Sequence, residues 1–171
     1  DYIGINADEA GNITISDTQA SLLVGAGLAF SEADGADDQI TVEASAEGTH
    51  LKTSLQDLQK LGVDTVLVTG DADSVTVDLG DPGDGVFEGA LSGGSLPIFG
   101  DIDQNGILSP EEDNDLSVTL NLDGDNVANQ IGNVVNLADE LAAAGIDYIG
   151  INADEAGNIT ISDTQASLLV G

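Results

Sequence analysis

Residues 1–25 of the chain recur without a single change at residues 147–171. The two copies read DYIGINADEAGNITISDTQASLLVG and start 146 residues apart, and independent drift would have scattered differences between them. We therefore expect the chain to be a segment of a tandem array. Residues 1–25 would be the end portion of the preceding repeat, and residues 26–171 would be one full period. A designed duplication is the alternative. A period of this length is that of whole domains in a string of beads or a rod, because small solenoids repeat every ~20–50 residues.

A weaker repeat divides the period into two half-units, at about residues 38–80 and 116–163. Each contains an alternating strand, an amphipathic helix, a glycine that ends the helix (Gly62 or Gly145), and two further strands joined by a tight turn. This order predicts a mixed α/β (α+β) fold of two βαββ half-units, with helices packed on a mixed sheet. A further helix is expected at residues 18–30.

The charge balance excludes several classes of partner. The chain has 32 Asp and Glu residues against 2 Lys and Arg, a formal net charge of −30. Nucleic acids and anionic membrane surfaces are bound through Lys and Arg, so neither is expected as a partner. No apolar run approaches the ~20 residues of a membrane-spanning helix, so membrane insertion is not expected either. The absence of cysteine excludes disulfides and thiolate metal sites.

The glycine-rich stretch between the half-units leads into the segment DIDQNGILSPEE, residues 101–112. This segment fits the twelve-residue calcium loop of the EF-hand, with a glycine (Gly106) at position 6 for the sharp turn. The expected calcium ligands at positions 1, 3, 5, 7, 9 and 12 are Asp101, Asp103, Asn105, Ile107 through its backbone carbonyl, Ser109 and Glu112. Hard oxygen ligands suit Ca²⁺, whereas Zn²⁺ would require histidine or cysteine. A solvated acidic turn is the alternative interpretation.

The loop resembles those of EF-hand and dockerin-type proteins over these twelve residues alone. The preceding segment SGGSLPIFG cannot form the long entering helix of a full hand, although Ser109 and Pro110 can open one helical turn. A structural staple is therefore expected rather than a conformational sensor. Weaker acidic candidates, each interpreted as a solvated turn with further calcium binding left open, are Asp71 with Asp73, Asp81 with Asp84, and Asp123 with Asp125.

Catalysis is not expected. The sequence contains no GxSxG, P-loop, HExxH or dinucleotide-binding motif. With so many carboxylates in the chain, any chosen pair is uninformative. His50 is the only histidine and is interpreted as a surface residue rather than a general base, and the only cations are Lys52 and Lys60.

Repeats of this size and identity, high acidity, the lack of cysteine and the embedded loop resemble the repetitive regions of giant calcium-dependent bacterial surface proteins. That family includes adhesins and surface-layer or filament proteins. The resemblance implies an extracellular structural module, an extender or filament unit, that calcium folds and rigidifies. Its expected partners are neighbouring identical repeats, and lateral self-association into filaments is left open. The alternative is a carbohydrate- or surface-binding adhesion module acting through avidity, with Tyr2 and Tyr148 as the only tyrosines for a sugar platform.

Overall fold

The computed structural model describes most of the period between its two identical ends. The described residues are 2–5, 12–32, 39–45, 50–70, 73–80, 95–113, 116–122 and 127–151. The end of the second half-unit, residues 152–163, lies outside them. So do five of the weaker acidic candidates, Asp71, Asp81, Asp84, Asp123 and Asp125.

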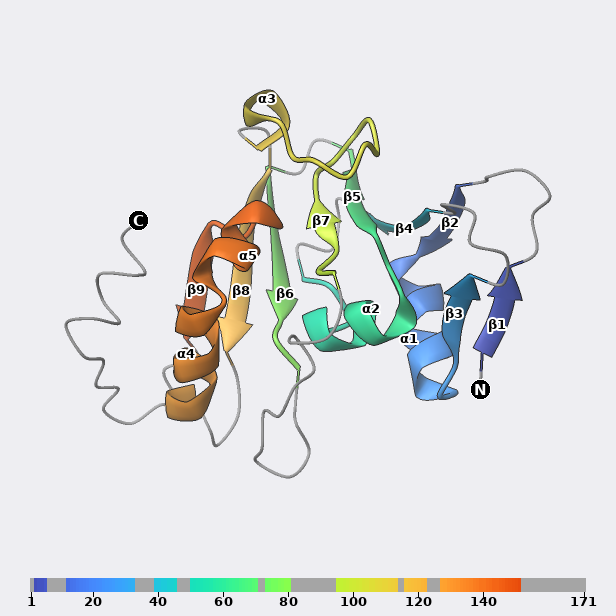
Figure 1. Ribbon diagram of the computed structural model, residues 1–171, viewed down its shortest axis with the longest axis horizontal. Coiled ribbons are helices and arrows are strands. Elements are labelled where there is room, and N and C mark those ends of the chain that lie inside the picture. The colour runs from blue at the N-terminus through green and yellow to red at the C-terminus, as the bar shows by residue number, and fades with distance from the viewer. Residues whose placement is uncertain are drawn as a thin grey trace.

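The described part of the chain contains both strands and helices, which confirms the mixed α/β class (Figure 1). The strands are β1 (Tyr2–Ile5), β2 (Ile13–Ser16), β3 (Ala29–Glu32), β4 (Ile40–Ser45), β5 (Thr65–Thr69), β6 (Ser74–Asp78), β7 (Ile98–Phe99), β8 (Ser117–Leu122) and β9 (Tyr148–Ile151). The helices are α1 (Asp17–Gly25), α2 (Leu55–Leu61), α3 (Pro110–Asp113), α4 (Val127–Asn136) and α5 (Ala138–Ala143). Within the described residues, none of these helices is long and apolar enough to cross a membrane.

The strands form three groups, with the orders β1-β3, β2-β4-β5-β7 and β6-β8-β9. Every strand pair in the described part of the chain is parallel, so the prediction of a mixed sheet is wrong. The helices explain the difference. A helix that follows a strand returns the chain to the same end of the sheet, and the next strand then runs in the same direction. This occurs from β4 through α2 to β5, and from β8 through α4 and α5 to β9.

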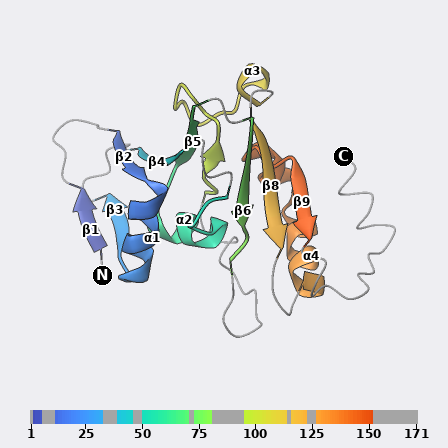
Figure 2. The same cartoon turned by 180° about the vertical axis from the view of Figure 1, so that it is seen from behind.

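The two strands that follow α2 also differ from expectation. The sequence predicts β5 and β6 as neighbours joined by a tight turn, but β5 pairs with β4 and β7 while β6 pairs with β8. The connection begins at Gly70, whose φ of 103° lies in the region that favours glycine. The chain therefore passes from one sheet into the other between β5 and β6, and the view from behind shows β6 beside β8 rather than beside β5 (Figure 2).

The helix predicted at residues 18–30 is shorter than expected. Ser16 opens α1 with a capping box, in which its side chain accepts from the Gln19 backbone N–H and the Gln19 side chain accepts from the Ser16 N–H. The helix ends at Gly25, and Gly27 has a φ of 68° that the helix cannot continue through. The last residues of the predicted helix belong instead to β3.

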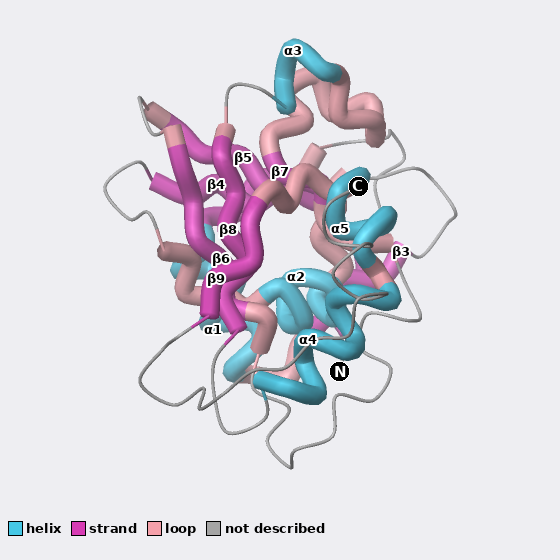
Figure 3. Tube along the Cα trace, turned by 90° about the vertical axis from the view of Figure 1, so that its left-hand side faces the viewer, coloured by secondary structure: helices cyan, strands magenta, loops and turns pink. Residues whose placement is uncertain are grey.

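A single core runs through both half-units. On α2, Leu55, Leu58 and Leu61 are fully buried, and the other buried apolar residues lie in the same contiguous cluster. Viewed along the long axis, β4, β5, β6, β8 and β9 gather on one side of the molecule and α2, α4 and α5 on the other (Figure 3). Leu79, just after β6, links the half-units, because its N–H donates to the Asn121 carbonyl and its own carbonyl accepts from the Gln56 N–H.

Each helical crossover closes on the same aspartate contact. The Ile40 N–H donates to Asp64 Oδ2 at 2.8 Å, and the Val118 N–H donates to Asp147 Oδ2 at 2.7 Å. In return, the Asp64 N–H donates to the Ile40 carbonyl and the Asp147 N–H to the Val118 carbonyl. Burial raises the pKa of Asp64, and the hydrogen bond from Ile40 partly opposes that shift. The acceptor oxygen of Asp64, rather than its charge, therefore stabilises the crossover.

Replacing Asp64 tests this assignment. A raised folded-state pKa contributes stability below the unfolded-state value of about 3.9 and loses it as the pH rises through the folded-state value. Asp64→Asn keeps an acceptor for Ile40, so at pH 7 it should unfold in urea no more easily than the parent protein. Asp64→Ala leaves the buried Ile40 N–H unpaired and should lower the free energy of unfolding by about 1–3 kcal/mol. An Asn variant as damaged as the Ala variant would contradict the assignment.

Candidate metal centre

The twelve-residue loop 101–112 follows β7 and ends within α3, at one edge of the molecule (Figure 1). Gly100 introduces it with a φ of 85°. Asp101 is fully buried beneath the loop, whereas Asp103 is exposed and Glu112 is partly exposed. One carboxylate oxygen from each of these three residues lies within 4.8 Å of the others. The loop therefore gathers three acidic side chains that could hold a metal ion.

Hydrogen bonds from the loop backbone position two of the carboxylates. Asp101 accepts from the N–H of Gly106 at 2.8 Å and from that of Asn105 at 3.3 Å. Asp103 accepts from the Asn105 N–H at 3.2 Å and from its side-chain amide at 2.8 Å. These contacts wind the backbone around the acidic side chains, and the winding places Gln104 and Gly106 at φ values of 55° and 78°.

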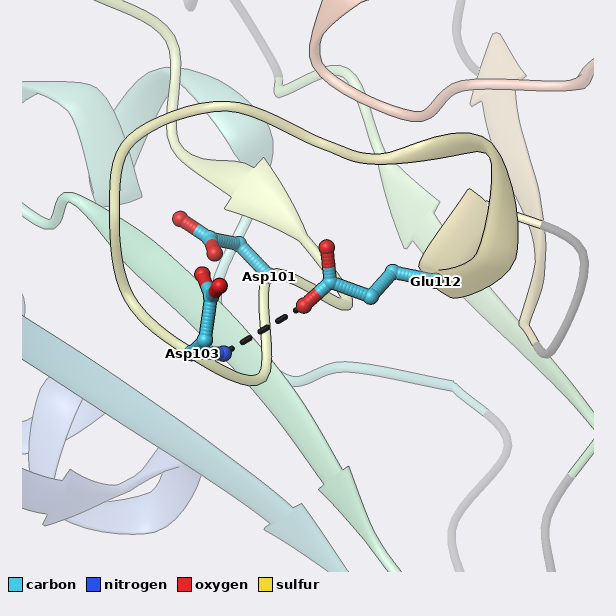
Figure 4. A group of neighbouring side chains, drawn as sticks. All are labelled: Asp101, Asp103 and Glu112. Atoms are coloured by element: carbon cyan, nitrogen blue, oxygen red, sulfur yellow. Dashed lines mark hydrogen bonds between the residues drawn. The ribbon is translucent and has the colours of Figure 1, made fainter.

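Glu112 closes the loop from its far end. It lies on α3, and its carboxylate reaches across the loop toward Asp101 and Asp103 (Figure 4). Its Oε1 accepts from the N–H groups of Ile102 and Asp103 at 3.0 and 3.3 Å, and its Oε2 accepts from the Ser109 N–H at 3.1 Å. The Glu112 N–H in turn donates to Ser109 Oγ at 3.4 Å. This reciprocal pair is a capping box, and α3 begins at Pro110 as the sequence predicts.

The carboxylates differ in their electrostatics. Burial raises the pKa of Asp101, and the neighbouring Asp103 raises it further against the hydrogen bonds from Gly106 and Asn105. Hydrogen bonds from Ser109, and then from Asp103 and Ile102, lower the pKa of Glu112. A cation among these oxygens would offset the repulsion between Asp101 and Asp103 and the desolvation of Asp101. The donor set thus fits a hard metal ion.

The side chains of two other predicted ligands form hydrogen bonds within the loop. The side-chain oxygen of Asn105 accepts from the Ile107 N–H at 2.8 Å, and the hydroxyl of Ser109 accepts from Glu112. Both side chains therefore brace the loop in this structure. The side chain of Ile107 is largely exposed. The weaker candidate Asp73 is exposed and is not part of the three-carboxylate group.

The loop is tied to distant parts of the chain by contacts that sequence reasoning missed. The Gln104 carbonyl accepts from the Gln39 side chain at 2.7 Å, and the Gln104 side chain accepts from Asn12. On the opposite side, the loop residue Leu108 lies so close to Gly145 that an added Cβ would be 3.0 Å from its side chain. The local spacing of the calcium motif carries no signal for these partners. The loop therefore connects the starts of β2 and β4 to the end of α5.

His50 is not part of the three-carboxylate group. Its Nε2 is 2.9 Å from Asp78 Oδ1, and both side chains are exposed to solvent. In the part of the chain that the structure describes, the loop carries the one group of three or more acidic, histidine or cysteine side chains close enough to share an ion.

Comparisons of the chain with protein-family models, with curated proteins and with solved structures found no match.

Two glycine substitutions separate the loop's backbone requirement from a general effect of adding a methyl group. A Cβ at Gly106 or at Gly132, on α4, would meet open space. Gly106 has a φ of 78°, so Gly106→Ala should cost about 1–2 kcal/mol of unfolding free energy. Gly132→Ala should instead add up to about 1 kcal/mol, because alanine favours a helix. Chemical denaturation of both variants checks this, and an equal response of the two would show that the loop does not impose its backbone conformation.

Proposed function

We propose that this chain is an extracellular structural module of a large, repetitive bacterial surface protein, and that calcium folds and rigidifies it. The observation that carries the proposal is the position of the acidic group. Asp101, Asp103 and Glu112 lie in a loop that contacts both half-units, so an ion bound there would hold segments that are far apart in the sequence. The exact repeat of residues 1–25 supports a place in a tandem array.

The chemistry of the loop favours calcium among the hard cations. Its residues match the twelve-residue template, which supplies the 6–8 oxygens that Ca²⁺ takes in flexible geometry. Mg²⁺ requires a nearly ideal octahedron and retains several of its waters, so an adaptable loop of protein oxygens suits it less. In the bound state, Asn105 and Ser109 would turn their oxygens from the loop backbone to the ion. The ion would neutralise charge that the protein otherwise buries at Asp101.

The structure around the loop supports a staple rather than a switch. A calcium sensor opens a pair of helices, whereas this loop is preceded by the two-residue β7 and followed by the four-residue α3. An ion that binds the folded chain and not the unfolded chain stabilises it by mass action. With a net charge of −30, the same ion also relieves repulsion that opposes compaction.

The composition supports a location outside the cell. Extracellular calcium modules function with dissociation constants of about 10⁻⁴–10⁻³ M, which millimolar external calcium satisfies. A chain without cysteine has no disulfides with which to stabilise a secreted fold, and bound ions would serve instead. The proposed partners are the neighbouring identical repeats.

Thermal unfolding in EDTA, in ~5 mM Ca²⁺ and in equal Mg²⁺ tests the proposal, since this calcium level exceeds the range of weak extracellular sites. At about 5 to 50 times its dissociation constant, the ion adds about 1–2.3 kcal/mol. For a chain of this size, that corresponds to a rise in Tm of roughly 2–9 °C. Calcium should produce such a rise, and magnesium a smaller one.

Two double variants with matched loss of charge complete the experiment. Asp101→Asn with Glu112→Gln should abolish most of the calcium-dependent rise. Glu43→Gln with Glu140→Gln removes two exposed carboxylates elsewhere and should retain it. If the parent protein melts at the same temperature with and without calcium, or if both double variants respond equally, the loop is not the calcium staple.

A further inference from the structure

The two copies of one strand stand at opposite ends of the molecule. β1 and β9 both read YIGI, and each falls within a copy of the repeated segment. Figure 1 shows β1, beside β3, at one end of the long axis and β9, beside β8, at the other. Among the described strands, β1 pairs only with β3 and β9 pairs only with β8. The same four-residue sequence therefore pairs with β3 in its first copy and with β8 in its second copy.

In the four-stranded sheet β2-β4-β5-β7, a single strand has neighbours that correspond to both of these partners. Its strand β5 lies between β4, which it follows through α2, and β7. On the β4 side, Asp64 precedes β5 and binds the Ile40 N–H, as Asp147 precedes β9 and binds the Val118 N–H. The pairs Thr41 with Thr65 and Thr119 with Tyr148 then follow in the same register. Strands β4 and β5 are therefore the counterparts of β8 and β9.

On the other side of β5, its pairing with β7 corresponds to the pairing of β1 with β3. Val66, the second residue of β5, pairs with Phe99 of β7, and Ile3, the second residue of β1, pairs with Phe30 of β3. Each phenylalanine also lies against a glycine that ends a helix. A Cβ at Gly145 would be 3.0 Å from the Phe99 carbonyl oxygen, and one at Gly62 would be 3.7 Å from that of Phe30.

The first strand of the sheet matches as well. β2 pairs with β4 through Ile13 and Ile40, and β6 pairs with β8 through Val75 and Val118. Ile40 and Val118 are the two residues whose N–H groups the crossover aspartates bind. Placing β9 on its copy β1 thus turns β6-β8-β9 and β1-β3 into one sheet with the order and register of β2-β4-β5-β7.

We propose that consecutive repeats share this sheet, and that the outer edge of β9 is the surface on which the β3 segment of the following repeat docks. The inference rests on the proposed tandem arrangement and adds the way in which repeats are joined. Tyr148 and Ile151 of β9 are 63% and 42% exposed, which is unusual for large apolar side chains on an edge strand. The occupant is the β3 segment supplied by the next repeat of the same array, and no separate linker is needed at the boundary.

Amide hydrogen exchange tests the proposal on a two-period chain, made of residues 1–171 followed by residues 26–171 again. A strand paired on one side has alternate N–H groups without a partner, whereas a strand paired on both sides has all of them bonded. In the single-period chain, only alternate amides of β9 should be protected. In the two-period chain, all amides of the boundary strand should exchange at least tenfold more slowly than the unprotected ones did, and as slowly as those of β5.

Two complete copies of residues 1–171 joined by a Gly-Ser linker provide the matched control. Each copy then keeps its own β1 and β9, so the linked protein should show the single-period pattern at both. An alternating pattern at the boundary strand of the two-period chain would overturn the shared sheet, because the strand would then keep only one neighbour. Protection at β9 that depends on protein concentration in the single-period chain would instead show edge pairing between separate molecules and would also overturn it.

The outcomes separate this inference from the proposed function. If melting depends on calcium but the boundary strand shows the alternating exchange pattern, the calcium-binding module is supported and the shared sheet is contradicted. If all amides of the boundary strand are protected but calcium does not change the melting temperature, the shared sheet is supported and the calcium staple is contradicted.

Discussion

The paired backbone contacts made by Asp64 and Asp147 determine how both half-units are built. Each aspartate follows a helix-ending glycine, accepts the N–H of the strand before the helix and donates its own N–H back to the same residue. The contact fixes where the returning strand begins, and in a parallel pair that choice sets the register of every following residue. The three leucines of α2 then cover the sheet in one half-unit, and α4 and α5 take that place in the other.

The acidity of the chain places a second constraint on this architecture. Thirty uncompensated negative charges oppose compaction, and the loop at residues 101–112 concentrates three carboxylates where one of them is fully buried. Hydrogen bonds within the loop stabilise Glu112 in its charged form but only partly offset the burial of Asp101. A cation bound there would satisfy both carboxylates, and the loop's contacts with Gln39 and Gly145 would pass its stabilisation to both half-units.

Local signals in the sequence predict the elements and the loop, whereas pairing between distant strands escapes them. Gly62 and Gly145 end their helices at φ values of 84° as expected, and the spacing of the motif identifies the three clustered carboxylates. The division of β5 and β6 between two sheets depends on β7 and β8, which follow much later in the chain. Helix periodicity also hid β3, because Leu28 and Phe30 continue the apolar pattern of α1 beyond the glycines that end it. Partners of the loop such as Gln39 have no local motif at all.

If calcium and a shared sheet join the repeats as proposed, the array is a continuous rod. Small-angle X-ray scattering of chains with one, two and four periods in calcium measures this most directly. For such a rod, the maximum dimension should increase in proportion to the number of periods at a constant cross-section, and removing calcium with EDTA should destroy this proportionality. A dimension that grows roughly as the square root of the number of periods, as for freely jointed units, or one that is the same with and without calcium, would contradict the account.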